Sequence, residues 1–558
     1  MERNEKLRKV QQQYEALKSE RDDIKPQWQE LSDLFMPQGG RLLGEDGKRT
    51  GRNTQLVDST GVYALRNLAA GLFGGVTNPA RLWFKLGLPD RELAQARSVS
   101  SWLEQTAQVM NDLLHRSNFY DVIQAVYMQV GCFGTGCMLV YPDEKNPKSL
   151  VFRELVAGEY VLQCDSHNRI NTCAYKTQMT ALQLKEKFGE ENLSDQVKQA
   201  LKLESSWYER FPVIHMITPR NDRNITKEDA KNMEYASYWW EEGDVEDFLR
   251  ESGFVVSPAI GVRWDVVGAD TYGCSPSMDA LPDCRMLQAM KRSLIKALHK
   301  EVDPPMAVPS GLKKPDLAPS GINPVPTAAG GQSIYPAMQI RPNTQGTLQA
   351  VADVRDQIRR GLFNDLFQMV SQIQHTGVTA TQITGMQEEK LVMLSPVLER
   401  LHSELFIPLI DYLFHHMQAV GTMPPPPQEI QGAPIKVEFV SILAKAQKQI
   451  GTAALDRFCM FIGANGQFLP ELMDTVDADK LSDEYADMLG VSMDIIRDQG
   501  ERDALRKSRA DAQMGAEAVS QGGEMAKAAK TLSETTIEDA EHNMLASVLG
   551  GTGVLPSQ

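Results

Sequence analysis

The sequence has few cysteines and aromatic residues and no long apolar run. Seven cysteines among 558 residues exclude the disulfide framework of small secreted proteins and predict reduced thiols in a protein assembled in the cytosol. No stretch reaches the roughly 18 apolar residues that a membrane-spanning helix needs. Residues 1–13 have no apolar core, so no signal peptide is expected there. Hydrophobic residues still make up 42% of the chain, which predicts several packed cores and excludes wholesale disorder.

Basic residues are also in deficit. Lysine and arginine number 58 against 73 aspartates and glutamates, so the net charge is −15. General nucleic-acid binding depends on many basic side chains that neutralise phosphates, and this composition argues against it. Local basic stripes remain compatible with the overall charge.

Motifs of catalysis are missing as well. GEDGKRT at 44–50 departs from a phosphate-binding loop in two ways: Leu42 stands where the first glycine is required, and Arg49 stands where serine or threonine must follow the lysine. GCFGTG at 131–136 has its glycines in the wrong order for a dinucleotide site and predicts a tight turn from a helix to a strand. Neither Cys132 and Cys137 nor His415 and His416 have the partners of a metal site. We therefore predict no enzyme, no catalytic or metal site and no cofactor.

The first 270 residues predict an α+β region. Leu7, Val10, Tyr14 and Leu17 form one helical stripe, and Pro26 suits the first turn of a second helix. Further helices are expected over 58–71, over 98–114 with Ser98 or Ser100 as cap, and over 120–130 with a break at Gly131. Strands are expected at 82–86, 137–141, 160–164, 172–177, 213–217, 235–240 and 254–259.

Two amphipathic helices around a proline-rich insert dominate the middle of the chain. The first, over 279–300, places Leu287, Met290, Leu294 and Leu298 on one face. Nine prolines between 304 and 346 exclude a helix there, although 306–308 and 333–335 suit short strands. The second helix carries its stripe through Leu348, Val351, Val354, Ile358, Leu362, Leu366 and Met369. Together they predict an out-and-back hairpin with an irregular tip.

The remainder is mainly helical. A run over 380–420 begins at the capping-box pattern of Thr379 and Gln382, and Pro396 and Pro408 are expected to kink or split it. A proline spacer at 424–427 precedes a strand at 435–440. Helices follow, exposed after about residue 505, and the last ten residues are expected to be disordered.

Five segments, taken in their order along the chain, carry a family resemblance. They are LAAGLFGGVTNPARLWF at 68–84, FGTGCML at 133–139, the helix over 279–305 that ends in EVDPP, the residues from Thr379 to Leu401, and KVEFVSILAKAQ at 436–447. Together they resemble the head-to-tail connector (portal) proteins of short-tailed, podovirus-type bacteriophages. The resemblance covers roughly residues 1–500.

This resemblance implies a homo-oligomeric ring of about twelve subunits at a capsid vertex of the virion, assembled in the host cytoplasm. A terminase motor pumps double-stranded DNA through such a ring without sequence specificity, and the DNA is later ejected. Tail adaptor proteins, capsid protein and scaffolding protein are the other implied partners, and no membrane is involved. Two alternatives remain: another virion component, such as a tail adaptor or internal scaffold, and the packaging motor itself. The failed phosphate-binding loop argues against the motor.

The resemblance also implies a division of the chain. The fold expected is α+β and predominantly helical, of the portal type. Its parts are a wing over 1–275, a first stem helix over 276–303, a clip over 304–346, a second stem helix over 347–371, a tunnel loop with channel-wall or wing helices over 372–450, and a helical crown over 451–558 whose C-terminal tail is expected to be disordered.

Basic residues lie opposite the apolar stripe of the stem, at helical spacing. The DNA-channel candidates are Arg285, Arg292, Lys296, Lys300 and Arg360. On one interpretation they face the bore and steer DNA. On the other they pair with acidic residues of a neighbouring subunit or are simply solvated.

Two further sets of candidates follow from the resemblance. The polar segment 372–379 corresponds to the tunnel loop that constricts the channel, with Gln374, His375, Thr376 and Gly377 as candidates, although an ordinary interhelical turn fits equally well. In the clip, proline lowers the entropy lost on binding, so this insert is expected to carry the partner surface. Its partner-binding candidates are Lys313, Lys314 and Tyr335.

Overall fold

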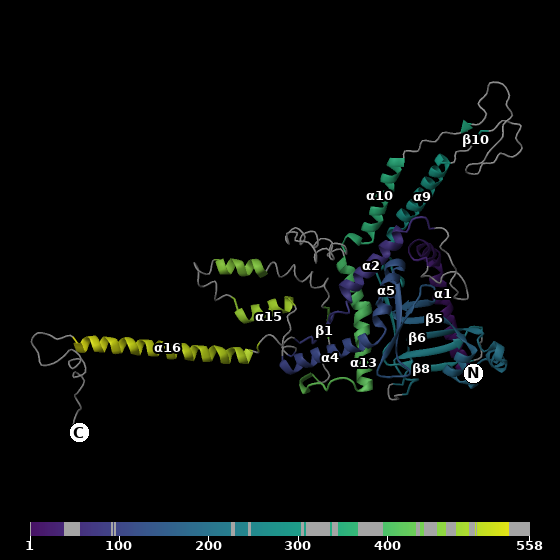
Figure 1. The fold of residues 1–558 in the computed structure, drawn as a ribbon. Helices are drawn as coiled ribbons and strands as arrows, with labels where there is room; N and C mark the ends of the chain where they lie inside the picture. Colours follow the sequence, from purple (N-terminus) through teal and green to yellow (C-terminus); the bar gives the residue numbers. More distant parts are fainter. Residues whose placement is uncertain are drawn as a thin grey trace, which may run out of the picture. The chain divides into compact units, whose positions relative to one another are not determined.

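A computed structural model of the chain confirms an α+β fold that is mostly helical (Figure 1). It describes residues 2–37, 56–90, 93, 96–224, 229–243, 247–302, 306–307, 335–336, 344–366, 394–430, 436–439, 455–464, 476–489, 497 and 499–534. The chain divides into two compact units, Met1–Ala454 and Leu455–Gln558.

The N-terminal helix α1 (Glu2–Phe35) serves two cores. Its first half packs against the face of a five-stranded sheet, and its second half enters the main core with Trp28 and Phe35 fully buried. The expectation that Pro26 starts a new helix was wrong, because the helix continues through it. A proline inside a helix costs one hydrogen bond, and burial of the apolar stripe on both sides of Pro26 offsets that loss.

Two antiparallel sheets of three and five strands form most of the β part that the structure describes. One has the order β4 (Tyr160–Cys164), β5 (Ile170–Thr180), β6 (Arg210–Pro219), β7 (Tyr235–Glu241) and β8 (Arg250–Phe254). The other has the order β3 (Leu150–Leu155), β2 (Thr135–Pro142) and β9 (Ala259–Arg263). The single strand predicted at 254–259 was wrong, since residues 255–258 connect the end of β8 to the start of β9. Helices α6 (Ala181–Phe188) and α7 (Asp195–Lys202) and strand β3 were not anticipated.

Helices α2 (Thr60–Val76), α4 (Arg97–Arg116) and α5 (Phe119–Phe133) contribute to the main core. The predicted caps Ser98 and Ser100 lie inside α4, which begins after Ala96 without a side-chain cap. The predicted break at Gly131 was also wrong. Helix α5 ends at Gly134, which takes the left-handed conformation with φ 76° and leads directly into β2, so the predicted helix-to-strand turn is confirmed.

Two antiparallel helices project side by side from this body (Figure 1). The short α8 (Pro276–Asp279) leads into α9 (Leu281–Val302), and α10 (Thr344–Gly361) returns. Between them, β10 (Met306–Ala307) pairs antiparallel with β11 (Tyr335–Pro336), which confirms the predicted hairpin. Helix α10 ends earlier than its stripe predicts, because Phe363 adopts a left-handed φ of 57°.

The helix after residue 394 is interrupted but not split. Residues 394–401 are helical, His402–Phe406 form a π-turn (η3), and α13 (Ile407–Val420) follows. Pro408 stands directly after the π-turn, where the widened hydrogen-bond pattern accommodates its missing N–H. Further on, β12 (Lys436–Phe439) pairs antiparallel with β1 (Phe84–Gly87), in agreement with both predicted strands.

In the second unit the structure describes a helix over 455–464, α15 (Ala478–Leu489) and the 36-residue α16 (Gln499–Glu534). Arg506 on α16 makes two 2.6 Å hydrogen bonds to the carboxylate of Asp479 on α15. The described side chains of α16 are almost all exposed, as its composition predicts. The predictions for 44–50, for the capping box at Thr379 and for the last ten residues fall outside the described residues.

Candidate functional site: the paired helices and the contacts at their base

An apolar seam joins α9 and α10 near the body of the first unit. The buried members of the two predicted stripes are Leu287, Leu294, Val351, Val354 and Ile358 on the two helices, and Leu362 and Leu366 just after α10. Toward the far ends of both helices the apolar side chains become exposed. Val302 is 85% exposed and Leu348 is 52% exposed. Within the described residues, the distal part of the helix pair therefore presents exposed apolar side chains.

The helix pair is basic within an acidic chain. Helix α9 carries five lysine and arginine residues against two acidic residues, and α10 carries three against two. Arg292 and Lys296 are exposed on α9, whereas the side chain of Lys300 is outside the described part. Arg360 is exposed at the end of α10, with its Nε 3.9 Å from a carboxylate oxygen of Asp365.

Arg285 differs from the other basic candidates. Its guanidinium forms a bidentate ion pair with the carboxylate of Glu30 on α1. The hydrogen bonds from Arg285 lower the pKa of Glu30. Because this side chain is already held by its own chain, Arg285 fastens α9 to α1.

A polar cluster fixes the base of the helix pair. Gln288 on α9 accepts hydrogen bonds from the backbone N–H groups of Val57 and Asp58, at 2.9 and 3.0 Å, and donates one to the Asp58 carbonyl at 2.7 Å. The Asp58 carboxylate accepts bonds from Thr60 and, at 2.7 and 3.1 Å, from Arg355 on α10. Burial of the Asp58 carboxyl would raise its pKa, but the bonds from Thr60 and Arg355 outweigh burial and lower the pKa.

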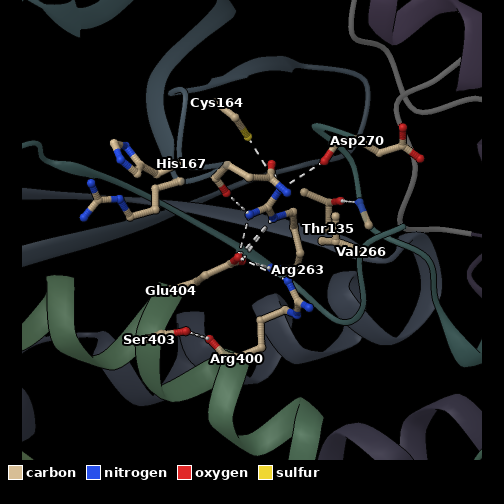
Figure 2. Close-up of polar contacts among 12 residues, drawn as sticks. Thr135, Cys164, His167, Arg263, Val266, Asp270, Arg400, Ser403 and Glu404 are labelled. Atoms are coloured by element: carbon tan, nitrogen blue, oxygen red, sulfur yellow. Dashed lines mark hydrogen bonds and ion pairs between the residues drawn. The ribbon is translucent and has the colours of Figure 1, made fainter. Parts of the chain in front are cut away.

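A second polar cluster lies deeper, around Arg263 at the end of β9 (Figure 2). Arg263 is almost fully buried, and its Nη2 is 2.6 Å from the carboxylate of Glu404 in the π-turn. The backbone N–H of Arg263 donates to the same carboxylate at 2.9 Å. The remaining N–H groups of the guanidinium reach Asn168, the Asp270 carbonyl and the Cys164 sulfur.

This Arg263 cluster joins both β-sheets to the helix over 394–420. The charge of Arg263 is matched by one carboxylate, and most of its donors have partners, which is the condition under which a charge is tolerated inside a protein. Sequence reasoning missed the cluster, since Asn168, Arg263 and Glu404 are isolated polar residues with no common motif. Its hydrogen bonds and ion pair hold these elements in place.

Most of the tunnel-loop and clip candidates lie outside the described residues. Gln374, His375, Thr376 and Gly377 lie outside the described residues, as do Lys313 and Lys314. Tyr335 belongs to β11, where it is the register partner of Ala307.

Within the described ranges, no group of three or more histidine, cysteine, aspartate and glutamate side chains is arranged to hold a metal ion. None of the described helices has the length and apolar character of a membrane span. The cysteines are all free thiols. The described part of the first unit is an α+β body with two polar clusters and a projecting basic helix pair.

Comparisons with known proteins identify the family. Residues 7–496 match the family described as bacteriophage head to tail connecting protein. The chain is 37% identical over 536 residues to the probable portal protein of Bordetella phage BPP-1, covering 95% of this chain and 96% of that protein. It is 38% identical over 535 residues to the portal protein of Salmonella phage epsilon15, covering 94% and 95%.

A solved virion structure of a native gene transfer agent particle shares 14% identity, with a TM-score of 0.29 over 72% of this chain and 90% of that one. That similarity is too low to carry any conclusion. The family match and the two relatives suffice: the chain belongs to the bacteriophage head-to-tail connecting proteins, the portal proteins. It is a non-enzymatic component of the virion at the vertex where head and tail join.

Proposed function

We propose that copies of this chain form a closed ring of about twelve subunits, in which the α9–α10 pairs stand side by side around a channel for double-stranded DNA. The apolar side chains at the far end of each pair support this arrangement. Leu298, Val302 and Leu348 are exposed in one chain, and an adjacent pair would cover them. Such contacts are head-to-tail, as a ring of this kind requires.

The observation that carries the proposal is the basic charge of the helix pair in a chain of net charge −15. A conduit must let a duplex slide. Many phosphate contacts over the whole surface would hold the DNA, whereas a few rings of positive charge guide it. The excess of acidic residues elsewhere keeps the rest of the ring from binding DNA.

We assign the bore role to Arg292, Lys296, Lys300 and Arg360. Arg285 is the weakest of the five candidates, because its guanidinium is paired with Glu30 of the same chain. The choice between bore and subunit interface for the others depends on how neighbouring helix pairs meet, and we favour the bore because exposed Arg292 and Lys296 lie off the apolar seam.

The finer division of the chain is part of the same proposal. We infer a wing over 1–275, a stem made of α9 and α10, a clip formed by the insert with Lys313, Lys314 and Tyr335 on its partner surface, a tunnel loop with Gln374–Gly377, and a crown from the second unit. The clip would meet the terminase motor during packaging and tail adaptors afterwards. Capsid and scaffolding proteins would meet other surfaces of the ring.

Charge reversal tests the bore role. The double variant Lys296→Glu and Lys300→Glu should package DNA at least tenfold less efficiently than the parent while still forming rings. The matched control is Lys198→Glu with Lys202→Glu, which changes the net charge equally at the half-buried Lys198 and the exposed Lys202 of α7, outside the pair. Equal packaging by both double variants and the parent would remove the bore role.

Ring formation is tested on the full-length protein by negative-stain microscopy with a mass measurement. We expect closed rings with a central hole of roughly 20–40 Å, which leaves clearance around a duplex. A full-length protein that stays monomeric under all assembly conditions would contradict ring formation, whatever the packaging assay of the charge-reversal variants shows.

A further inference from the structure

Five side chains form one row across the five-stranded sheet. Tyr160, Tyr175, His215, Trp239 and Arg250 are successive register partners on β4, β5, β6, β7 and β8. Directly opposed residues of antiparallel strands point to the same face, so the row runs from one edge of the sheet to the other. It begins with buried aromatic rings and ends with an exposed arginine on the edge strand.

The aromatic part of the row is held rigidly. The His215 ring is stacked on Trp239 with centroids 3.9 Å apart and an angle of 8° between the planes. The Nε2 of His215 lies 2.8 Å from the Ser237 hydroxyl, and its Nδ1 lies 3.1 Å from the Tyr175 hydroxyl. Both ring nitrogens therefore have partners, and the indole of Trp239 rests on a fixed support.

Three cations gather around this support. Lys187 on α6 places its Nζ 4.0 Å from the centroid of Trp239, and Arg153 on β3 lies over Tyr175 at 5.5 Å. Arg250 is the register partner of Trp239. They come from three separate elements, so the tertiary fold alone brings them together. Among the residues that the structure describes, none of the three has an ion-pair partner.

Gathering like charges costs free energy. Burial lowers the pKa of Lys187 most, and Arg153 and Arg250 lower it further, while Glu144 opposes them. Cation–π contacts stabilise these side chains only in part. An anion between the three groups would relieve the repulsion and accept charge-assisted hydrogen bonds, in the bidentate form that guanidinium groups offer to carboxylates.

The surroundings favour a short acidic segment over a nucleic acid. Glu190, Glu191 and Asp195 follow closely after Lys187, at the end of α6 and the start of α7. A duplex carries a charge about every 1.7 Å, so its backbone would extend past the three cations and meet these carboxylates. One or two carboxylate side chains fit the cations without that repulsion.

We propose that Arg153, Lys187 and Arg250 form a docking site for an acidic peptide segment of a partner protein, with Trp239 as its rigid floor. The site lies on the sheet of the first unit and not on the projecting helix pair, and it does not depend on the DNA channel (Figure 1). Its partner is defined by chemistry: a chain that presents adjacent glutamate or aspartate side chains.

Binding of a fluorescent hexaglutamate peptide to the full-length protein tests the site, measured by anisotropy at low salt. The double variant Lys187→Gln and Arg250→Gln should weaken binding at least tenfold. The control Lys198→Gln with Lys202→Gln removes the same charge from nearby α7 and should change binding less than twofold. Lys187→Arg with Arg250→Lys keeps both charges and should retain binding, which separates charge from folding.

Three results would overturn the proposal. The first is a failure of the peptide to bind, or an equal loss of peptide affinity in the Lys187 and Arg250 glutamine variant and in the Lys198 and Lys202 control. The second is tighter binding of a 30-base-pair duplex with the same dependence on Lys187 and Arg250, which would make the surface a nucleic-acid site. The third is loss of ring assembly in the Lys187 and Arg250 glutamine variant, which would assign the cations to contacts between copies of this chain.

Discussion

The guanidinium of Arg263, the last residue of β9, is paired at 2.6 Å with the carboxylate of Glu404, which lies 141 positions later inside a π-turn. The same carboxylate also accepts the backbone N–H of Arg263. The Glu404 carboxylate thus neutralises the Arg263 guanidinium and also accepts the hydrogen bond of the last backbone N–H of β9. A π-turn inserts one extra residue into a helix, and here it carries Glu404 at the point of contact. We infer that the ion pair and the π-turn stabilise each other.

Removing the charge of Glu404 should leave Arg263 buried without a counter-ion. The variant Glu404→Gln should lose about 3 kcal/mol of stability, since breaking one side of a buried ion pair has that scale of cost. All seven tryptophans precede residue 265, so urea unfolding followed by tryptophan fluorescence reports on the first unit alone. Arg400→Gln is the control, because Arg400 is partly exposed and its guanidinium lies farther from the Glu404 carboxylate, at 3.7 Å. This variant should lose less than about 1 kcal/mol of stability. Equal midpoints for the two variants would contradict this prediction.

Asp58 should make the stability of the first unit depend on pH. Its folded-state pKa lies below the ordinary value of 3.8. A carboxyl group with a lowered pKa stabilises the fold above its unfolded pKa, and that contribution is lost as pH falls through the folded pKa. Asp58→Asn should therefore unfold at lower urea concentration than the parent at pH 7, with a gap that shrinks below about pH 4. The exposed Asp356→Asn serves as control, and a gap for Asp58→Asn that stays constant down to pH 3 would refute the role.

Two glycines in the same left-handed conformation should respond differently to alanine. Both Gly134 and Gly421 cap a helix, with φ of 76° and 69°. A Cβ atom on Gly134 would stand 2.1 Å from the carbonyl oxygen of Gly273, whereas one on Gly421 has open space. Gly421→Ala should cost about 1 kcal/mol from backbone strain alone. Gly134→Ala should cost more than about 3 kcal/mol or prevent soluble expression, because backbone atoms would have to move. Similar urea midpoints for the two alanine variants would show that the close approach of Gly273 to Gly134 adds no cost beyond backbone strain.

The cysteines should differ in reactivity according to burial. Cys137 and Cys173 place their sulfurs 3.8 Å apart in the interior, where the neighbouring Cys173 and burial raise the pKa of Cys137 well above its usual value. Neither should react with Ellman's reagent before unfolding. Cys274 is exposed, but partial desolvation of its thiol and the nearby Asp265, Asp270 and Asp279 raise its pKa. Its reaction should therefore be slow at pH 7 and accelerate up to and beyond pH 9. Cys274→Ser should remove that phase, and an unchanged thiol count in this variant would contradict the assignment.

Local patterns predicted the elements better than their ends. The stripe of Leu287 and Leu294 foretold α9, and the prolines of the insert foretold its irregular course. Strands β4, β6 and β7 lie where alternating or continuous apolar residues placed them. Ends were missed where a distant contact decides them: α5 passes Gly131 and stops at Gly134, where the chain packs against Gly273. No pattern in the neighbouring sequence distinguishes the two glycines.

The candidate site likewise has features that the sequence predicts and features that only the tertiary structure determines. The basic face of α9 is visible in the sequence, since helical spacing is a property of nearby residues. The pairing of Arg285 with Glu30 is not visible, because it depends on how α1 crosses α9. The same holds for Arg153, Lys187 and Arg250, which gather only when two sheets and α6 have packed together.

The sequence by itself determined the helices with their apolar stripes, the proline-rich insert, the acidic balance and, through its ordered motifs, the portal family. Periodicity and composition act over a few residues, so they can be recognised without the fold. Tertiary structure alone decided that α1 continues through Pro26, that Glu404 meets Arg263, and that a row of side chains crosses five strands. Those outcomes depend on packing between segments far apart in the chain, where burial and charge pairing outweigh local preference.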